Sequence, residues 1–399
     1  MKIALNIEGV GSRRGGAEKY AGTLARWLTA AGHHVYVFAR EVDAGELPAG
    51  TVVHRVRPFC PPGLGFLRSY LFARASERAL RGQQFDLIVG FVKTWYQHAY
   101  LAVGGAHPAS LDSNSKRFRS RLLRAVWWAG KVLSIKQWVF RAIARKQFAE
   151  GHCPHVIAPS RMVAEHFQQY HGVPPERISV VYNALDPTAS LPDAAGVRES
   201  FRRRQGLTSD DVAVLFVARN YALKGLEPLL QAFAAVASDH PQARLIVCGS
   251  RRDGRYRRQA KRLGLDGRVL FLGFVDDIRQ CFAGSDVFAF PTFYDPCSLV
   301  VPEAMVAGLP VITTRQNGAG ELVREGVHGF VVDSPWELEQ LSDRLARLVG
   351  DAALRQRMGE QARAAARTYT VEARQQELHD ALRRAAGDPL ARPALRDAA

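Results

Sequence analysis

Two basic side chains stand five positions apart in a short polar segment of the second half of the chain. Arg219 and Lys224 follow an apolar run over residues 212–217, whose composition is typical of a buried strand. The planar guanidinium of an arginine and the mobile ammonium of a lysine can together neutralise a diphosphate. A solvated basic loop is the alternative, but a position directly after a parallel strand favours the interpretation as a binding site.

Two acids stand eight positions apart after another apolar run, Val287–Phe290. Asp295 and Glu303 flank an apolar stretch, and we expect a helix to begin at Leu299 and to end at Gly308. This pattern places Asp295 in the loop before the helix and Glu303 on the helix itself. A carboxylate there can accept hydrogen bonds from paired sugar hydroxyls. The alternative is an acid at a helix start, which the helix dipole favours.

A glycine-rich loop follows the first apolar run of the chain. Gly15 and Gly16 come directly before a helical pattern that continues through Leu24 and Leu28. Adjacent glycines at a helix start leave backbone N–H groups accessible, and the helix dipole adds positive potential, so a phosphate or a sugar oxygen can bind. The loop matches neither the G-x-G-x-x-G dinucleotide pattern nor a P-loop, and a plain tight turn is the alternative.

Histidines and cysteines offer two further candidate sites in the first half. His107 follows Gly104, Gly105 and Ala106, and a lone histidine of this kind is more often structural than catalytic. His152, Cys153 and His155 surround the start of one expected strand without a second cluster, so we expect no zinc site. Because no Asp-x-Asp pair occurs, we expect no metal-bridged diphosphate and no metal site at all.

Short apolar runs alternate with helical patterns along the chain, which predicts an α/β fold whose parallel sheets are covered on both faces. The expected strands of the first half are Lys2–Ile7, His34–Phe38, Val52–Val56, Phe85–Gly90, His155–Ala158 and Ile178–Val181. Those of the second half are Val212–Val217, Ala243–Val247, Val269–Phe271, Val287–Phe290, Val311–Thr313 and Gly329–Val331. A break over residues 186–206 separates the two series.

We therefore predict two Rossmann-like, doubly wound domains that face each other across a cleft, where ligands of such folds bind. The first domain would comprise residues 1–185, completed by a C-terminal helix over 371–386, and the second residues 186–370. A chain of 399 residues with 47% hydrophobic and 23% charged residues can form two cores and is not a disordered protein.

The charge and the cysteines limit the partners and the compartment. A net charge of +16 requires an anionic partner: a nucleotide, a nucleic acid or an acidic membrane. Five cysteines without a Cys-x-x-Cys pair predict reduced thiols. Neither a signal peptide nor an apolar run of about 20 residues is recognisable, so we expect a cytoplasmic protein.

The segment over residues 116–146 is rich in basic residues, lacks acids and contains three of the six tryptophans of the chain. Basic residues beside Trp and Leu on an amphipathic helix suit an anionic membrane surface. The alternative is a helix with core tryptophans and solvated arginines. No nucleic-acid-binding module is recognisable, so we expect no nucleic acid partner. We expect Gly130 to divide the segment into two helices, and the membrane-binding residues to be Arg117, Arg121, Arg124, Trp127 and Trp128.

Taken together, these segments resemble the family-4 retaining glycosyltransferases of GT-B fold. Five motifs agree in order and spacing and extend over nearly the whole chain: the Gly15-Gly16 loop, the linker 181–186, Arg219-x4-Lys224-Gly225, Asp295…Glu303 and the stretch 303–311. The E-x7-E signature of the family has Asp at its first position here. The Gly-Gly-Ala-His run that ends at His107 resembles the branch of the family that builds the lipopolysaccharide core.

The resemblance implies a role for each of these residues. Glu303 would bind the ribose hydroxyls of a nucleotide sugar, and Asp295 the hydroxyls of the transferred sugar. Arg219 and Lys224 would hold the diphosphate leaving group in place of a metal ion. His107 would contact the sugar or stabilise charge at its anomeric carbon. The donor-binding set is completed by Gly15, Gly16, Ser298, Leu299 and Val300.

The resemblance predicts retaining transfer of a hexose, glucose from UDP-glucose, to a heptose of the lipopolysaccharide inner core. The enzyme would need no cofactor besides this nucleotide-sugar donor. It would lie on the anionic inner face of the plasma membrane, where a lipid-linked glycan acceptor is found. The alternatives are a family-4 enzyme that uses another nucleotide sugar for a different bacterial glycan, and a non-catalytic protein that binds a nucleotide sugar or a membrane.

Overall fold

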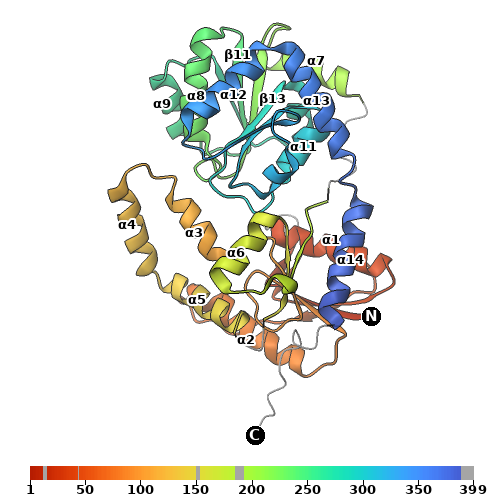
Figure 1. The fold of residues 1–399 in the computed structure, drawn as a ribbon. Coiled ribbons are helices and arrows are strands. Elements are labelled where there is room, and N and C mark those ends of the chain that lie inside the picture. Colours follow the sequence, from red (N-terminus) through yellow and green to blue (C-terminus); the bar gives the residue numbers. More distant parts are fainter. Residues whose placement is uncertain (12–15, 44, 150–152, 185–192, 388–399) are drawn as a thin grey trace. The chain divides into compact units, whose positions relative to one another are not determined.

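The computed structural model describes residues 1–11, 16–43, 45–149, 153–184 and 193–387, which divide into two compact units (Figure 1). The first unit comprises Met1–Ala109, Phe118–Val181 and Gln376–Ala399. The second comprises Ser110–Arg117 and Tyr182–Gln375. The domain boundary that the sequence predicts between residues 185 and 186 lies outside the described residues.

A seven-stranded parallel sheet forms the centre of the first unit. In spatial order its strands are β5 (Val52–Arg55), β3 (His34–Ala39), β1 (Lys2–Asn6), β6 (Leu87–Phe91), β7 (Ala99–Leu101), β8 (His155–Ala158) and β9 (Ile178–Val180). The order reverses between β1 and β6, and such a switch point is where open parallel sheets bind ligands, beyond the carboxyl ends of the strands. The short strands β2 (Gly9–Val10) and β4 (Glu41–Val42) form a separate pair.

Helices cover both faces of this sheet (Figure 1). Ile3 and Leu5 of β1 pack in one core with α1 (Gly16–Ala30) and α14 (Val371–Gly387). Ala4, on the opposite face of the same strand, packs in a second core with α2 (Arg68–Arg81) and α5 (Ile135–Gln147). The remaining helices are α3 (His107–Ser115), α4 (Arg121–Val132), α6 (Arg161–His171) and the 3-10 turns η1 (Gly65–Leu67) and η2 (Pro175–Arg177).

The second unit has a six-stranded parallel sheet around a single hydrophobic core. In spatial order its strands are β12 (Val269–Gly273), β11 (Ala243–Cys248), β10 (Val212–Val217), β13 (Val287–Phe290), β14 (Val311–Thr314) and β15 (Gly329–Val332). The order reverses between β10 and β13, as it does between β1 and β6. The helices are α7 (Ala194–Arg204), α8 (Leu226–Asp239), α9 (Gly254–Arg262), α10 (Arg279–Gly284), α11 (Val300–Val306), α12 (Leu338–Gly350), α13 (Ala352–Ala366) and the 3-10 turn η4 (Gly318–Leu322).

The predicted α/β class with two doubly wound parallel sheets is confirmed. The basic segment forms two helices, as predicted, but the break between them does not lie at Gly130. Helix α4 continues through Gly130 to Val132, and the chain turns at Leu133 and Ser134 before α5 begins. A Cβ added at Gly130 would meet no atom within 4 Å, so packing does not require a glycine at this position of the helix. Arg117 lies before α4, whose first residue is Arg121, so the two arginines do not share a helix.

Candidate functional site

Two loops meet beyond the carboxyl ends of β10 and β13, at the switch point of the second sheet. The backbone N–H of Phe293 donates to the carbonyl oxygen of Leu223 at 2.9 Å. The hydroxyl of Thr292 donates to the same oxygen at 3.2 Å. Gly225 has a φ of +81°, and a Cβ there would lie 1.8 Å from the carbonyl oxygen of Pro291. The loop after β10 therefore fits against the loop after β13 only because residue 225 is a glycine.

Lys224 and Asp295, predicted to bind different parts of a donor, form an ion pair with each other. The Nζ of Lys224 lies 2.6 Å from Oδ2 of Asp295 and donates to the carbonyl oxygen of Tyr294 at 2.9 Å. Both side chains are largely buried, which strengthens the attraction relative to an exposed pair. Each charge thus holds the other in place at the switch point.

Arg219 differs from Lys224 in its surroundings. It follows the last residues of β10, its side chain is exposed, and no hydrogen bond or ion pair holds it within the described part of the chain. The backbone beside it is tightly fixed, because a Cβ on Gly249 would lie 2.4 Å from the carbonyl oxygen of Ala218. The hydroxyl of Tyr221 also donates to the carbonyl oxygen of Ser250 at 2.9 Å. A rigid backbone therefore presents a mobile cation at the edge of the sheet.

The loop that carries Asp295 is anchored by a buried amide that the sequence analysis missed. Asn317, after β14, donates from Nδ2 to the hydroxyls of Ser298 at 2.9 Å and Thr313 at 3.0 Å. Its Oδ1 accepts from the backbone N–H of Ser298 at 3.3 Å and of Ala319 at 3.1 Å. The side chain of Asn183 donates to the carbonyl oxygen of Cys297 at 2.7 Å. The position of Asn317 after a parallel strand is a signal that could have identified it.

The predicted acidic helix begins close to where the sequence places it. Helix α11 starts at Val300, with Leu299 as its exposed N-cap residue. Ser298, next to Leu299, is buried and bonded to Asn317. Glu303 is a half-buried residue in the first turn of the helix, as predicted. Ser298, Leu299, Val300 and Glu303 therefore continue the loop of Asp295, and the second unit brings them together with Lys224.

Two further residues that were predicted to contact the donor, Gly16 and His107, belong to the first unit. Gly16 is the first residue of α1, and a Cβ there would meet no atom within 4 Å, so packing does not require glycine. Gly15 lies outside the described residues. His107 begins α3, and its Nε2 lies 2.7 Å from Oε1 of Gln137 on α5. Burial lowers the pKa of His107, which favours a neutral imidazole at neutral pH.

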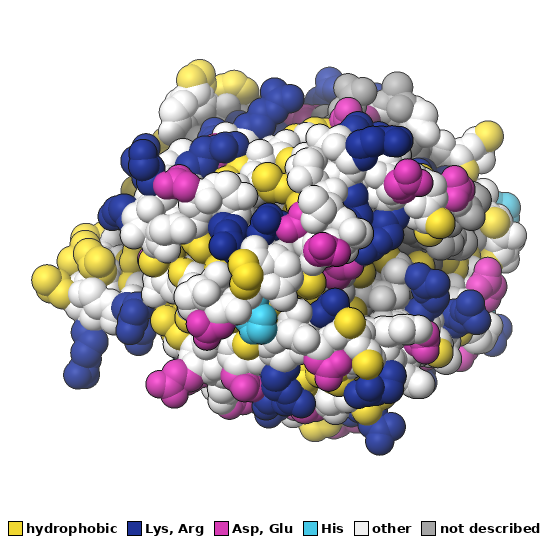
Figure 2. Space-filling view, turned by 90° about the horizontal axis from the view of Figure 1, so that it is seen from above, with side chains coloured by type: hydrophobic (Ala, Val, Ile, Leu, Met, Phe, Trp, Pro, Cys, Tyr) yellow, Lys and Arg dark blue, Asp and Glu magenta, His cyan; other side chains and the backbone are white. Residues whose placement is uncertain are grey.

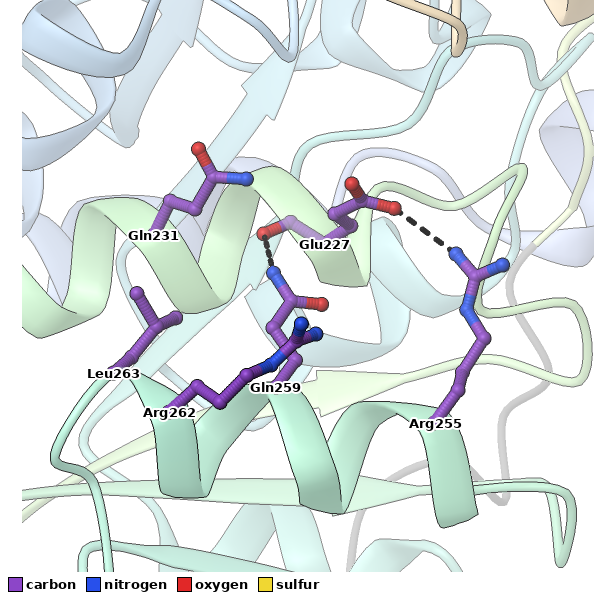
Figure 3. Close-up of a pocket in the computed structure, with 6 residues that line it drawn as sticks. All are labelled: Glu227, Gln231, Arg255, Gln259, Arg262 and Leu263. Atoms are coloured by element: carbon purple, nitrogen blue, oxygen red, sulfur yellow. Dashed lines mark hydrogen bonds and ion pairs between the residues drawn. The ribbon is translucent and has the colours of Figure 1, made fainter.

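A groove of about 540 Å³ lies between α8 and α9 (Figure 3). Arg255 lies 3.0 Å from Glu227, and the Nε2 of Gln259 donates to the carbonyl oxygen of Glu227 at 3.2 Å. Gln231, Arg262 and Leu263 complete its lining. Since none of the predicted site residues lines this groove, the loops at the switch point are the better candidate site.

Helix α4, the turn after it and the first part of α5 carry the apolar side chains that a membrane surface would contact. Leu122 is 73% exposed, Leu133 80% and Trp138 56%, whereas Trp127 and Trp128 are half-buried. The ring of Trp127 lies 5.2 Å from Nζ of Lys131, and 5.3 Å from the ring of Trp128. Figure 2 shows yellow side chains that project at the left edge of the face, with dark-blue Lys and Arg side chains beside them.

No group of three or more His, Cys, Asp or Glu side chains that could hold a metal ion occurs within the ranges that the structure describes. His152 lies outside them. None of the five cysteines forms a disulfide; the Sγ atoms of Cys248 and Cys281 lie 3.7 Å apart. Among the same described residues, no helix combines the length and apolar character needed to cross a membrane.

Two family models match successive parts of the chain. The model described as Glycosyltransferase Family 4 matches residues 14–189, and the model described as Glycosyl transferases group 1 matches residues 197–365. The first falls on the unit that contains His107, and the second on the unit that contains Arg219, Lys224, Asp295 and Glu303.

Individual proteins similar to this chain extend over most of its length. The lipopolysaccharide glucosyltransferase WaaG of Escherichia coli is 23% identical over 354 residues, which is 88% of this chain and 90% of that protein. A crystal structure of WaaG matches with a TM-score of 0.75 at 22% identity, over 96% of this chain and 98% of that one. Anabaena HepE, solved in complex with UDP-glucose, matches with a TM-score of 0.69 at 23% identity, over 96% of this chain and all (100%) of that one.

Proposed function

Because this chain belongs to the glycosyltransferases of GT-B fold, we propose that it transfers a hexose from a nucleotide sugar with retention of anomeric configuration. The donor we propose is UDP-glucose, and the acceptor is a heptose of the lipopolysaccharide inner core. Support for the acceptor is the similarity to a lipopolysaccharide glucosyltransferase. Support for the donor is the same relative, together with the similarity to a protein solved with UDP-glucose.

The observation that carries the proposal is the set of charges at the switch point of the second sheet. Arg219 is exposed on a rigid backbone, and Lys224 is held by Asp295 at 2.6 Å. In our proposal a diphosphate binds to the guanidinium of Arg219 and to Nζ of Lys224. These two cations then stabilise the negative charge that develops on the leaving group, so that no metal ion is needed.

The acids on the other loop bind hydroxyls in this proposal. Asp295 binds hydroxyls of the transferred sugar while it orients Lys224, and Glu303 binds the ribose hydroxyls from the first turn of α11. Backbone groups of Ser298, Leu299 and Val300 complete donor binding. Gly16 lets the donor phosphate approach the backbone of the first unit, together with Gly15.

Retention follows from attack on the face that the diphosphate leaves. The acceptor hydroxyl forms the new bond to the anomeric carbon as the bond to the diphosphate oxygen breaks. Its proton passes to that departing oxygen, whose charge Arg219 and Lys224 stabilise. His107, kept neutral by burial, contacts the sugar and stabilises positive charge at the anomeric carbon.

The test of transfer is the release of UDP from UDP-glucose in the presence of a truncated lipopolysaccharide with an exposed heptose. We expect release to need both substrates and to persist in a metal chelator, and NMR of the product to show the anomeric configuration of the donor. Glu303→Gln should raise the KM for UDP-glucose at least about tenfold, because it weakens charge-assisted bonds to the ribose.

The control for this variant is Glu337→Gln, which changes an exposed acid before α12 in the same unit. Unchanged kinetics of Glu303→Gln would contradict the assigned donor site. Release with another nucleotide sugar alone would identify a family-4 enzyme for a different glycan. Binding of UDP-glucose without any transfer would instead identify a non-catalytic nucleotide-sugar-binding protein.

We further propose that α4, the turn after it and the first part of α5 dock the enzyme on the inner face of the plasma membrane, which keeps it cytoplasmic and peripheral. The exposed side chains of Leu122, Leu133 and Trp138 would enter the interface. The cations Arg121 and Arg124, together with Arg117, would attract anionic lipids.

Co-sedimentation with phosphatidylglycerol vesicles tests the membrane contact. Changing Leu122, Leu133 and Trp138 together to Ser should abolish most binding, whereas Phe59→Ser, at a side chain 82% exposed elsewhere in the first unit, should not. Equal binding by both variants would overturn this segment as the docking element.

A further inference from the structure

The switch point of the first sheet carries polar groups to which neither the motifs nor the proposed function gives a role. Strands β1 and β6 are adjacent and parallel, with Asn6 paired to Gly90 near their carboxyl ends. Three residues after Gly90 the chain reaches Lys93, and His107 begins α3 in the same unit. A crevice at such a reversal of strand order is where ligands of these sheets bind.

A strained turn presents Lys93 at this point. Val92 has a φ of +47°, and it is the one non-glycine residue with positive φ among the described residues. A β-branched side chain in this conformation costs about 1–3 kcal/mol. The N–H of Lys93 donates to the carbonyl oxygen of Phe91 at 2.7 Å. The hydroxyl of Tyr100 donates to the carbonyl oxygen of Val92 at 3.3 Å. The fold thus keeps a strained residue in place directly before a lysine.

Lys93 has cationic and aromatic neighbours but no acid in ion-pair contact within the described chain. Its Nζ lies 4.3 Å from the ring centre of Phe140 on α5, and Nζ of Lys136 lies 5.7 Å from the same centre. The imidazole of His107 meets this ring edge to face, with centres 5.2 Å apart. Three nitrogen-bearing side chains therefore surround one aromatic ring.

The protonated state of Lys93 is disfavoured by these surroundings. Burial lowers the pKa of Lys93, and the charge of Lys136 lowers it further, while the charges of Glu8 and Glu18 oppose the shift. Glu8 is itself oriented by the hydroxyl of Ser69, which donates to its Oε2 at 3.1 Å. A bound anion between the two lysines would reverse the effect, because an opposite charge favours the protonated form of both.

A buried amide at the end of β1 also lacks partners. Asn6 is fully buried, and neither its Nδ2 nor its Oδ1 has a hydrogen-bond partner in the described structure. An unpartnered buried polar group is costly, and native proteins retain few of them. An amide offers both a donor and an acceptor, which is the combination that a sugar hydroxyl requires.

We propose that this cluster recognises an acceptor that carries a phosphate group. Lys93 and Lys136 bind the phosphate beside the ring of Phe140, and Asn6 binds a hydroxyl of the sugar that bears it. The inference rests on the proposed glycosyl transfer and names the acceptor class for it: a phosphorylated glycan rather than a neutral one. A phosphate could also come from a lipid headgroup, so the experiment separates the two sources.

Binding is measured by calorimetry on the full chain, with no need for turnover. The probes are deacylated lipopolysaccharide inner-core oligosaccharide with its phosphates, the same oligosaccharide after their chemical removal, and phosphatidylglycerol vesicles. Wild type should bind the phosphorylated oligosaccharide about tenfold or more tightly than the dephosphorylated one, as expected for charge-assisted bonds. Lys93→Gln should lose most of this preference, with Lys136 left as the one remaining cation of the pair, and Lys93→Arg should recover part of it.

Arg74→Gln, at an exposed position of α2 in the same unit, makes the same charge change and should keep the full preference. The proposal is overturned if wild type shows no preference for phosphate or if Lys93→Gln retains it. A Lys93→Gln variant that loses only vesicle binding would assign the site to a lipid headgroup and also overturn it. UDP-glucose binding, followed on the same samples by thermal shift, reports on the proposed function separately.

Discussion

The two switch points share one topology and differ in how their polar groups are satisfied. Both lie where the strand order reverses, between β1 and β6 in one sheet and between β10 and β13 in the other. At the second, Lys224 is paired to Asp295 at 2.6 Å. At the first, the amide of Asn6 has no partner among the described residues, and Val92 is held in a strained conformation.

The difference indicates two ways to prepare a binding site on the same scaffold. The loops of the second unit are linked to each other by side-chain and backbone hydrogen bonds, so Lys224 and Asp295 are oriented before a ligand binds. The first unit instead retains unsatisfied groups, which a polar ligand would satisfy. Substitutions should therefore impair catalysis most at the second switch point, and should reveal relief of strain only at the first.

The largest effect is expected from Lys224→Gln, which removes one of the two cations assigned to the leaving group. Loss of one preorganised electrostatic contact of this kind lowers kcat about 10²–10³-fold. We expect the KM for UDP-glucose to change less than kcat, because the charge of the diphosphate grows as it leaves. Steady-state kinetics of UDP release measure both parameters.

Arg315→Gln is the matched control, since it breaks an exposed ion pair of 2.6 Å with Asp333 in the same unit. An exposed pair contributes little, so kcat should stay within about threefold of wild type. Equal losses in the two variants would mean that the pairing of Lys224 with Asp295 has no catalytic significance.

The second prediction concerns the contact between the two loops. Gly225→Ala would place a Cβ 1.8 Å from the carbonyl oxygen of Pro291 at a φ of +81°. The clash with backbone and the strained φ should together reduce the free energy of unfolding by about 3 kcal/mol or more. Denaturation in urea measures the loss.

Gly264→Ala separates the two contributions. Gly264 has a φ of +72° but no neighbour within 4 Å of its Cβ position, so only the strain of about 1–2 kcal/mol applies. If Gly225→Ala were no worse than Gly264→Ala, the loops would not be held as tightly as the geometry indicates.

Much of the second site could be predicted from the sequence because each of its parts is local. Arg219 and Lys224 follow one unbroken apolar strand and Asp295 follows another, and ends of parallel strands lie at one edge of a sheet. The pairing of Lys224 with Asp295 could not be predicted from the sequence, since it joins residues 71 positions apart and depends on loop conformation. Asn317 was missed because its contacts with Ser298, on the loop of Asp295, join residues 19 positions apart.

The first unit was less predictable for two physical reasons. Strand β7 has only three residues, too few for a periodic pattern, and Gly130 did not end α4 because an exposed glycine costs a helix only about 1 kcal/mol. The strain at Val92 leaves no trace in the sequence, because valine is an ordinary strand residue. A positive φ there follows from packing of the whole turn, which composition does not reveal.

The third prediction concerns a pH dependence of stability that arises in the first unit. Burial lowers the pKa of His171, on α6 of the first unit, from 6.5 to about 4. Since the unfolded chain takes up this proton first, stability is complete above pH 6.5 and falls as the pH decreases toward 4. At pH 5 this proton uptake lowers the free energy of unfolding by about 2 kcal/mol.

Urea denaturation at pH 7 and pH 5 measures this loss. His171→Phe should remove most of it, because the ring would still stack on Phe148, at 4.5 Å, without taking up a proton. The neighbouring Tyr170→Phe should leave the pH dependence unchanged. A pH dependence that persists in His171→Phe would assign it to other groups.

The smallest expected effect has the opposite sign and is the sharpest test of the comparison. Val92→Gly removes the strain of a φ of +47°, and we expect it to raise the free energy of unfolding by about 1 kcal/mol, since the relief of about 1–3 kcal/mol exceeds the added entropy of the unfolded chain. Val52→Gly, at an equally exposed valine on β5, relieves no strain and should lower stability by a similar amount. If Val92→Gly were destabilising like Val52→Gly, the turn before Lys93 would store no strain, and the first switch point would differ from the second only in its unpaired polar groups.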